Sequence, residues 1–354
     1  IFLFFLLFFI FFKFCTCSIL YIIYSLLFIN MNKNYATMIN KILVTGGCGF
    51  IGSNFLRIMV SKYKKTNFLN IDSLTYAGKS TNVKNLKNKK NYEFLKLDIS
   101  NFSKLNNVIK KFKPKVIVHF AAESHVDNSI KSPGKFIQSN ILGTYNILRS
   151  INKNIFLLHI STDEVYGHVE NNKSFNEKTC YNPRSPYSSS KASADHLVSA
   201  WNVTYNYKST IVNCCNNFGP NQDNEKFIPV IINNIIKNRN IPVYGNGKQK
   251  REWIYVDDFI TSLDFIISKK LTNERFVIGS GKRFENKILA KKIISIFKNK
   301  LNFKKKIKLK KVKDRPGHDK EYKIDCRKLN NLGWKSKTNM DEDLIKKIKF
   351  FLKK

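Results

Sequence analysis

The chain has 354 residues, and its 43% hydrophobic content suffices for a sizeable core in one large domain or two. A formal net charge of +37 would suit non-specific phosphate binding, but the lysines are dispersed and no nucleic-acid module is recognisable. We therefore expect no specific nucleic-acid partner, although the lysine-rich run 298–313 could bind polyanions weakly. Seven cysteines without a Cys-x-x-Cys pair indicate a reduced cytosol and no metal site.

Residues 1–29 differ in kind from the rest, because they are nearly all Phe, Leu, Ile and Tyr with one internal charge. About 20 apolar residues can span a bilayer, so this stretch is long enough to do so. The chain opens with Ile1, however, and Met38 lies just before the first expected strand. We interpret residues 1–37 as a leader read from upstream sequence, which predicts a cytoplasmic protein. The alternative is a real signal or membrane anchor through residues 1–29.

The first motif is a strand, a glycine turn and a helix, in that order. The apolar run 41–45 breaks into Gly47-x-Gly49-x-x-Gly52, and a helical pattern follows. This spacing fits the dinucleotide fingerprint, in which glycines let the backbone approach a pyrophosphate at a helix N-terminus. A second run ends at Asp72, about 20 residues past the last glycine. A carboxylate there favours NAD over NADP, because it accepts from a ribose hydroxyl and repels a 2′-phosphate.

Strand and helix patterns continue to alternate after this motif. The run 92–97 ends at Asp98, and the run 116–120 leads into a polar segment, 121–127. The alternation predicts an α/β fold, a doubly wound parallel Rossmann sheet with a smaller C-terminal substrate-binding lobe. Asp98 fits a cofactor contact and a turn or helix-cap acid equally well. For His125 we favour a structural role.

Two polar motifs predict the chemistry. Asp163 and Glu164 follow the apolar run 155–160, so a proton donor and a proton acceptor would lie at a strand's carboxyl end, where open α/β sheets bind ligands. Tyr187 and Lys191 are four residues apart on a predicted helix and share one face. A lysine ammonium there would lower the pKa of the tyrosine and make it a base near neutral pH. Tyr-x-x-x-Lys is common by chance, and the cofactor motif gives it weight.

From residue 41 onward these motifs resemble the extended short-chain dehydrogenases, and within them the dTDP-glucose 4,6-dehydratases. Neighbouring acids at 163 and 164 distinguish this group, because epimerases and decarboxylases of the same fold typically lack them. The matching segments are 45–52, 72–78, 121–127, 161–167, 187–191, 216–220, 226–229, 242–245, 251–258 and 314–318.

The resemblance implies an internal redox cycle with NAD as cofactor. Tyr187 would deprotonate the sugar 4-hydroxyl during hydride transfer from C4, with Thr162 hydrogen-bonded to the reacting oxygen. Glu164 would then remove the C5 proton while Asp163 protonates the departing 6-hydroxyl, and hydride would return to C6. The product would be a 4-keto-6-deoxy sugar nucleotide.

The resemblance also implies the binding residues, three of which also belong to the catalytic set. The expected NAD contacts are Gly46, Gly49, Phe50, Ile51, Gly52, Asp72, Ser73, Leu74, Thr75, Asp98, Ile99, Phe120, Ala121, Ala122, Ser139, Tyr187, Lys191 and Asn217. The expected nucleotide-sugar contacts are Ser124, Glu164, Asn216, Lys226, Phe227, Pro242, Tyr244, Arg251, Asn286, Arg315 and His318. Arginines and lysines in the second set suit a diphosphate.

Other functions stay open on sequence alone. UDP-glucose 4,6-dehydratases share much of the pattern, other NAD-dependent epimerases or decarboxylases share the fold, and a basic binding protein could occupy a degenerate enzyme fold. Within the catalytic chain we expect residues 38–214 to form mainly the NAD-binding lobe and residues 215–354 mainly the sugar-nucleotide lobe. The resemblance further implies a homodimer.

Overall fold

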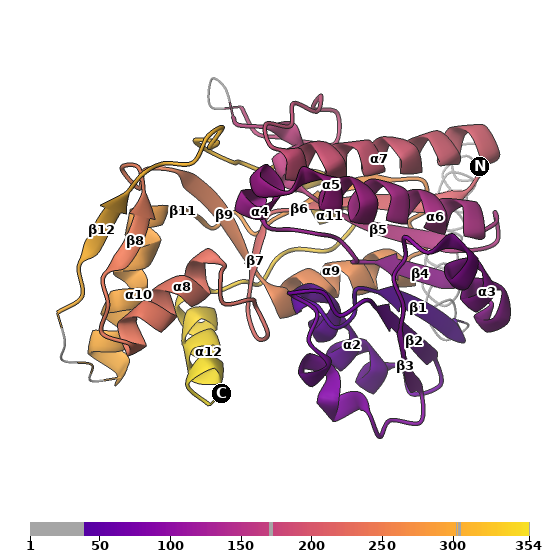
Figure 1. The fold of residues 1–354 in the computed structure, drawn as a ribbon, viewed down its shortest axis with the longest axis horizontal. Coiled ribbons are helices and arrows are strands. Elements are labelled where there is room, and N and C mark those ends of the chain that lie inside the picture. The colour runs from indigo at the N-terminus through magenta and orange to yellow at the C-terminus, as the bar shows by residue number, and fades with distance from the viewer. Residues whose placement is uncertain (1–38, 170–172, 302, 304–305, 354) are drawn as a thin grey trace, which may run out of the picture.

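The computed structural model describes residues 39–169, 173–301, 303 and 306–353 (Figure 1). The expected leader, residues 1–37, lies outside the described residues. Within the described ranges, no helix is both long and apolar enough to cross a membrane.

Seven parallel strands form the central sheet, in the order β10-β6-β5-β4-β1-β2-β3. The inner strands are apolar and buried on both faces, as a parallel sheet between two helix layers requires, and β5 is buried at every residue. This arrangement confirms the predicted doubly wound sheet. The strands are β1 (Lys41–Thr45), β2 (Asn67–Asp72), β3 (Tyr92–Lys96), β4 (Val116–His119), β5 (Phe156–Thr162), β6 (Lys208–Cys214) and β10 (Arg275–Ile278).

Helices cover both faces of this sheet (Figure 1). Successive side chains of a strand point to opposite faces of the sheet. Val44 therefore packs against a first group of helices on one face, and Leu43 packs against a second group on the other. The first group is α2 (Phe50–Lys62), η1 (Ser80–Leu86), α9 (Val256–Ser268) and α11 (Arg327–Asn331); the second is α3 (Phe102–Phe112), α6 (Gly143–Ser150) and α7 (Pro186–Tyr205). Short helical segments α4 (Val126–Lys131), α5 (Pro133–Phe136), η2 (Ile137–Leu142) and η3 (Asp163–Tyr166) complete this part.

A smaller lobe with its own core lies beside the sheet (Figure 1). Residues after 215 build most of it, but α9, β10 and α11 return to the central sheet. The division at residue 214 stays a prediction. The elements of this lobe are β7 (Asn216–Phe218), α8 (Phe227–Ile236), β8 (Ile241–Tyr244), β9 (Lys250–Tyr255), β11 (Arg283–Glu285), α10 (Asn286–Leu301), β12 (Leu309–Val312) and α12 (Met340–Leu352).

Candidate active site

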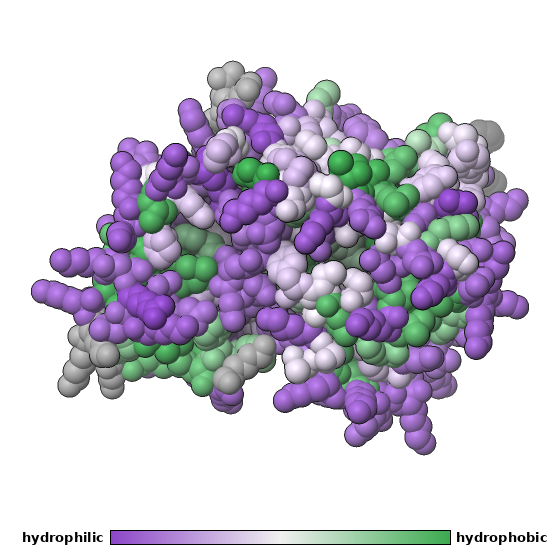
Figure 2. All heavy atoms as spheres, viewed as in Figure 1, coloured by the Kyte–Doolittle hydropathy of each residue, from purple (hydrophilic) through white to green (hydrophobic). Residues whose placement is uncertain are grey.

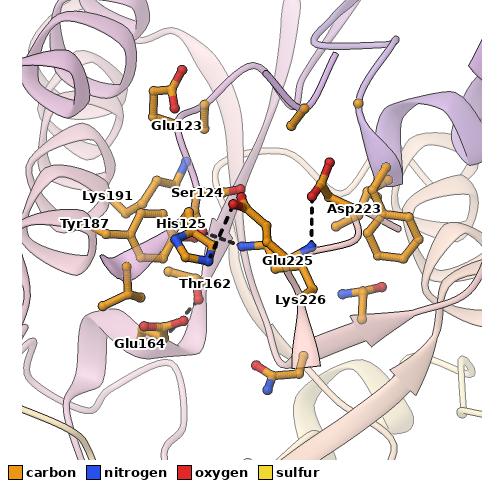
Figure 3. Close-up of a pocket in the computed structure, with 18 of the residues that line it drawn as sticks. Glu123, Ser124, His125, Thr162, Glu164, Tyr187, Lys191, Asp223, Glu225 and Lys226 are labelled. Carbon is orange, nitrogen blue, oxygen red and sulfur yellow. Dashed lines mark hydrogen bonds and ion pairs between the residues drawn. The ribbon is translucent and has the colours of Figure 1, made fainter. Parts of the chain in front are cut away.

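A cavity of about 880 Å³ is lined by both lobes and by the carboxyl ends of the central strands. Except for Leu74 and Asp163, every residue predicted to bind or react lines this cavity. Figure 3 shows Tyr187, Lys191 and Glu164 on one side of it, with Lys226 reaching in from the other lobe. Segments far apart in the sequence therefore meet at one site, as the motifs predicted.

The cofactor end is shaped by backbone that leaves no room for side chains. Gly46 has φ +70°, and a Cβ there would lie 2.5 Å from the backbone nitrogen of Ala121. A Cβ on Gly52 would lie 2.4 Å from the carbonyl oxygen of Gly46. Gly49 is the N-cap of α2, so the first amides of that helix face the cavity end. This loop fits the pyrophosphate of a dinucleotide.

Asp72 is held at the end of β2 by two backbone amides. Its Oδ1 accepts from the amide of Leu74 at 2.8 Å, and its Oδ2 accepts from the amide of Cys48 at 2.8 Å. Burial nevertheless raises the pKa of this carboxyl. Each oxygen keeps a lone pair for a ribose hydroxyl, because a carboxylate oxygen can accept two hydrogen bonds. At the same cavity the buried Oδ1 of Asn217 has no hydrogen-bond partner among the described residues, so an acceptor is also available there.

Asp98 and His125 have local structural contacts. Asp98 Oδ1 accepts from the amide of Ser100 at 2.8 Å, which is a turn contact, although the residue also lines the cavity. His125 is the N-cap of α4, where its Nδ1 accepts from the amide of Asn128 at 3.4 Å. His125 also lines the cavity, where its Nε2 lies 3.9 Å from Glu225 Oε2, so the structural role favoured for it stays a prediction.

Tyr187 and Lys191 lie on the first turns of α7, where a capping box on Ser185 fixes the start of the helix. Burial, and next the charge of Glu164, raise the pKa of Tyr187 well above its usual range, while a hydrogen bond with Thr162 opposes this. Lys191 Nζ donates to the carbonyl of Ile160 at 2.8 Å, and burial lowers the pKa of Lys191. The expectation of a lowered Tyr187 pKa is therefore wrong in this structure, because burial sets the direction of the shift.

The two acids occupy different environments although they are adjacent in the chain. Asp163 is 1% exposed and lies behind the cavity wall, and burial followed by the charge of Glu164 raises its pKa well above the usual range. Its Oδ1 accepts from Thr162 Oγ1 at 3.3 Å, and its Oδ2 has no hydrogen-bond partner in the described part of the chain. Glu164 lines the cavity. Burial raises the pKa of Glu164 too, but the charges of Arg251 and other cations oppose the rise.

Cations face Glu164 across the cavity. Arg251 is buried; its Nη2 donates to the carbonyl of Asp319 at 2.8 Å, and its guanidinium lies 4.2 Å from the ring centre of Tyr322. Lys226 Nζ donates to the carbonyl of Ser124 at 2.7 Å. Arg315 is a third cation at the cavity, and its guanidinium lies 4.9 Å from the ring centre of Tyr244. This end of the cavity can neutralise a diphosphate.

Sequence reasoning missed two residues that hold Arg251 in place. Asp319 and Tyr322 line the cavity, and the Tyr322 hydroxyl donates to Asp319 Oδ2 at 2.6 Å. The only available signal was the position of Asp319 directly after the segment 314–318. No pattern links either residue to Arg251, because that contact is made across 68 positions of the chain.

The fold and the cavity define a nucleotide-dependent enzyme of the extended short-chain dehydrogenase class. A family model described as GDP-mannose 4,6 dehydratase matches residues 43–348. A probable dTDP-glucose 4,6-dehydratase of Sinorhizobium fredii and a dTDP-glucose 4,6-dehydratase of Escherichia coli are each 40% identical to this chain, over 88% of it and 93% of the relative. The chain belongs to the dTDP-glucose 4,6-dehydratase family.

Solved structures agree with this assignment. The dTDP-glucose 4,6-dehydratase from Bacillus anthracis in complex with NAD has a TM-score of 0.80 and 36% identity, covering 89% of this chain and 97% of that one. DesIV, a dTDP-glucose 4,6-dehydratase from Streptomyces venezuelae with NAD and TYD bound, has a TM-score of 0.83 and 32% identity, with 88% and 97% covered. The similarity therefore extends over both lobes.

Proposed function

We propose that this chain dehydrates dTDP-glucose to dTDP-4-keto-6-deoxyglucose and keeps its NAD through the whole cycle. The observation that carries the proposal is the contrast between Asp163, which lies behind the cavity wall with its pKa raised by burial, and Glu164, which lines the cavity and faces cations. Two carboxyl groups in such different environments can act as acid and base in one step. Tyr187 and Thr162 line the same cavity, beside Glu164.

The glycine loop and Asp72 would hold NAD, and their geometry fits a dinucleotide. When bound, NAD accepts hydride from C4 and returns it to C6. Except for Leu74, the remaining expected contacts, such as Ala121 and Asn217, line the same cavity.

Tyr187 would take the proton of the 4-hydroxyl while Thr162 hydrogen-bonds the same oxygen. Because burial raises the pKa of Tyr187, the phenol needs positive charge nearby to act as a base. Lys191, one helical turn later on α7, would supply that charge.

Elimination would follow from the two acids. Glu164 would remove the C5 proton, which the ketone at C4 acidifies, and would return a proton to C5 when hydride adds to C6. Asp163 would donate a proton to the departing 6-hydroxyl, and Thr162 Oγ1 is the atom through which it can pass, since it lies 3.3 Å from Asp163 Oδ1 and Thr162 lines the cavity. Arg251, Lys226 and Arg315 would hold the diphosphate.

The proposal extends to a cytoplasmic homodimer. Ile137 of η2 is 57% exposed, and Ile130 and Leu142 nearby in the chain are each 42% exposed. Figure 2 shows apolar side chains breaking the hydrophilic surface over this side of the molecule. Exposed apolar patches commonly mark protein contacts, so we assign this face to the second copy. The cysteines among the described residues are free thiols, as a reducing compartment allows.

Mass spectrometry of the product tests the function. Protein with NAD⁺ is incubated with dTDP-glucose or with UDP-glucose, and loss of one water from dTDP-glucose, faster than from UDP-glucose, is the expected result. Faster loss of water from UDP-glucose would mean that UDP-glucose, not dTDP-glucose, is the substrate. If NAD binds and neither substrate loses water, the proposed dehydratase function is wrong. Epimerase or decarboxylase activity on other sugar nucleotides is then tested. A Tyr187→Phe variant should form no NADH, whereas Asp163→Asn should form NADH transiently and eliminate water slowly.

A further inference from the structure

Behind the catalytic wall a carboxylate lies out of reach of solvent. Asp195 of α7 is 0% exposed, and the side-chain hydroxyls, amide and imidazole of four residues converge on it. Its neighbours are His159 Nε2 at 3.1 Å from Oδ1, and Ser161 Oγ at 2.8 Å, Tyr181 hydroxyl at 2.7 Å and Asn213 Nδ2 at 3.0 Å from Oδ2. None of these residues was predicted to bind or react.

Its four hydrogen-bond partners favour the ionised form of this carboxylate. Burial raises the pKa of Asp195, but the hydrogen bond from His159 and the nearby charge of Lys191 outweigh burial and lower it. Burial and the charge of Lys191 in turn lower the pKa of His159, so its imidazole is neutral near neutral pH and donates from Nε2. A buried negative charge is stabilised by hydrogen bonds and further by a nearby positive charge. Lys191 supplies it, because it lies one turn earlier on the same face of α7.

Asp195 and Lys191 also both form hydrogen bonds with the carboxyl end of β5. Lys191 Nζ donates to the carbonyl of Ile160, and the next residue, Ser161, donates its hydroxyl to Asp195. Asn213 Nδ2 donates both to Asp195 Oδ2 at 3.0 Å and to the carbonyl of Thr162 at 3.2 Å. The strand end that carries the catalytic threonine and acids is thus tied to the helix that carries the tyrosine and lysine.

We propose that Asp195 is a positioning residue of the dehydratase: its buried carboxylate keeps Lys191 charged and holds the end of β5 in register with α7. The inference rests on the proposed function and adds a residue to its machinery. Asp195 touches neither substrate nor cofactor, since it does not line the cavity. Its effect passes through Lys191 and through the strand end.

The surrounding groups that could titrate or carry charge come from several elements. The titration of the Lys191 ammonium is therefore compared between variants in which all of these groups are unchanged. They are His119 on β4, His159 on β5, Asp163 and Tyr166 on η3, Tyr181 before α7, His196 on α7, Cys214 on β6 and Arg275 on β10.

The variant Asp195→Asn removes the charge and keeps the shape. In NAD-loaded protein, the rate of NADH formation in a single turnover is measured against pH. The fall of this rate at alkaline pH should begin about one pH unit lower than in the wild type, which is the shift expected for one nearby opposite charge. Tyr181→Phe is the matched control, because it removes one hydrogen bond to Asp195 and leaves the charge. Its rate of NADH formation should fall at the same alkaline pH as that of the wild type. If the rate of Asp195→Asn falls at the same pH as that of the wild type, the proposal is overturned.

A second readout does not depend on turnover. In ¹³C-lysine-labelled protein, the signal of Lys191 is identified by its loss in Lys191→Met, and its titration midpoint should fall in Asp195→Asn and stay in Tyr181→Phe. If the wild type forms neither NADH nor product, the proposed function fails, and this midpoint still decides the inference. Should Asp195→Asn not fold, Asp195→Glu keeps the charge but displaces it. It should then keep the Lys191 midpoint and slow NADH formation, and an unchanged rate would contradict positioning.

Discussion

The two ends of the cavity are made of different atoms. The cofactor end is backbone and glycine from one continuous segment, 46–52, with a carboxylate fixed by amides at Asp72. The nucleotide-sugar end is charged side chains from distant segments, such as Arg251 and Arg315. An end made of backbone tolerates no added atom, whereas an end made of side chains loses affinity in steps. The two ends should therefore fail in different ways.

The largest effect is expected from one methyl group at the cofactor end. In Gly52→Ala the new Cβ would lie 2.4 Å from the carbonyl oxygen of Gly46, which is backbone and cannot move aside cheaply. We expect loss of NAD from the purified protein and of all dehydration, measured by cofactor content and product formation. Gly134→Ala is the control, because its Cβ would meet nothing within 4 Å. Retention of NAD in Gly52→Ala would contradict the tight backbone fit.

A graded loss is expected at the other end. Arg315→Ala removes a cation that lines the cavity, and a hydrogen bond to a charged group contributes about 1.5–3 kcal/mol. The KM for the nucleotide sugar should rise about 10- to 100-fold, while NAD content stays at the wild-type level. Arg327→Ala, whose side chain is 82% exposed outside the cavity, serves as the control. If NAD content fell as well, the two ends would not be independent.

A change of stability with pH is expected at the boundary between the ends. Because the folded pKa of Asp163 is raised above its unfolded value of 3.8, its contribution to stability is full below pH 3.8 and is lost as the pH rises through the folded pKa. Asp163→Asn lacks this loss, so its Tm relative to that of the wild type should rise with pH, by at most about 2 °C for each kcal/mol. Thermal unfolding measured across pH checks this.

The matched variant for that measurement is Glu93→Gln on the exposed face of β3. Its Tm difference from the wild type should not follow the Asp163→Asn curve. A Tm gap for Asp163→Asn that stayed constant across pH would show that Asp163 is ionised in the folded protein, and its role as proton donor would then be wrong.

The smallest effect is expected where an exposed ion pair joins the two parts of the chain. Lys79 Nζ lies 3.6 Å from Asp223 Oδ2, and the lysine side chain is 50% exposed. Exposed pairs contribute at most about 1 kcal/mol, so Lys79→Ala should change NAD affinity less than about fivefold in a binding titration. Lys79→Arg should match the wild type. A loss above tenfold would mean that side-chain charge also holds the cofactor end.

Local signals explain what was predicted well. The strands expected at 41–45, 92–97 and 116–120 correspond to β1, β3 and β4 within one residue, because buried parallel strands are short apolar runs bounded by turns. Asp72 and Thr162 are the last residues of β2 and β5, so the expected polar groups do reach the carboxyl edge of the sheet. These features depend on neighbours within a few positions.

The sequence by itself indicated the doubly wound sheet, the glycine turn and a set of site residues that line the cavity except for Leu74 and Asp163, because each belongs to a contiguous motif. Only the tertiary structure decided that Asp163 lies behind the wall, that burial raises the pKa of Tyr187, and that Asp195 is enclosed by four partners. Burial and electrostatic environment are sums over groups from strands and helices distant in the sequence. A linear pattern cannot contain those sums, so the chemistry of each acid and base was settled by packing.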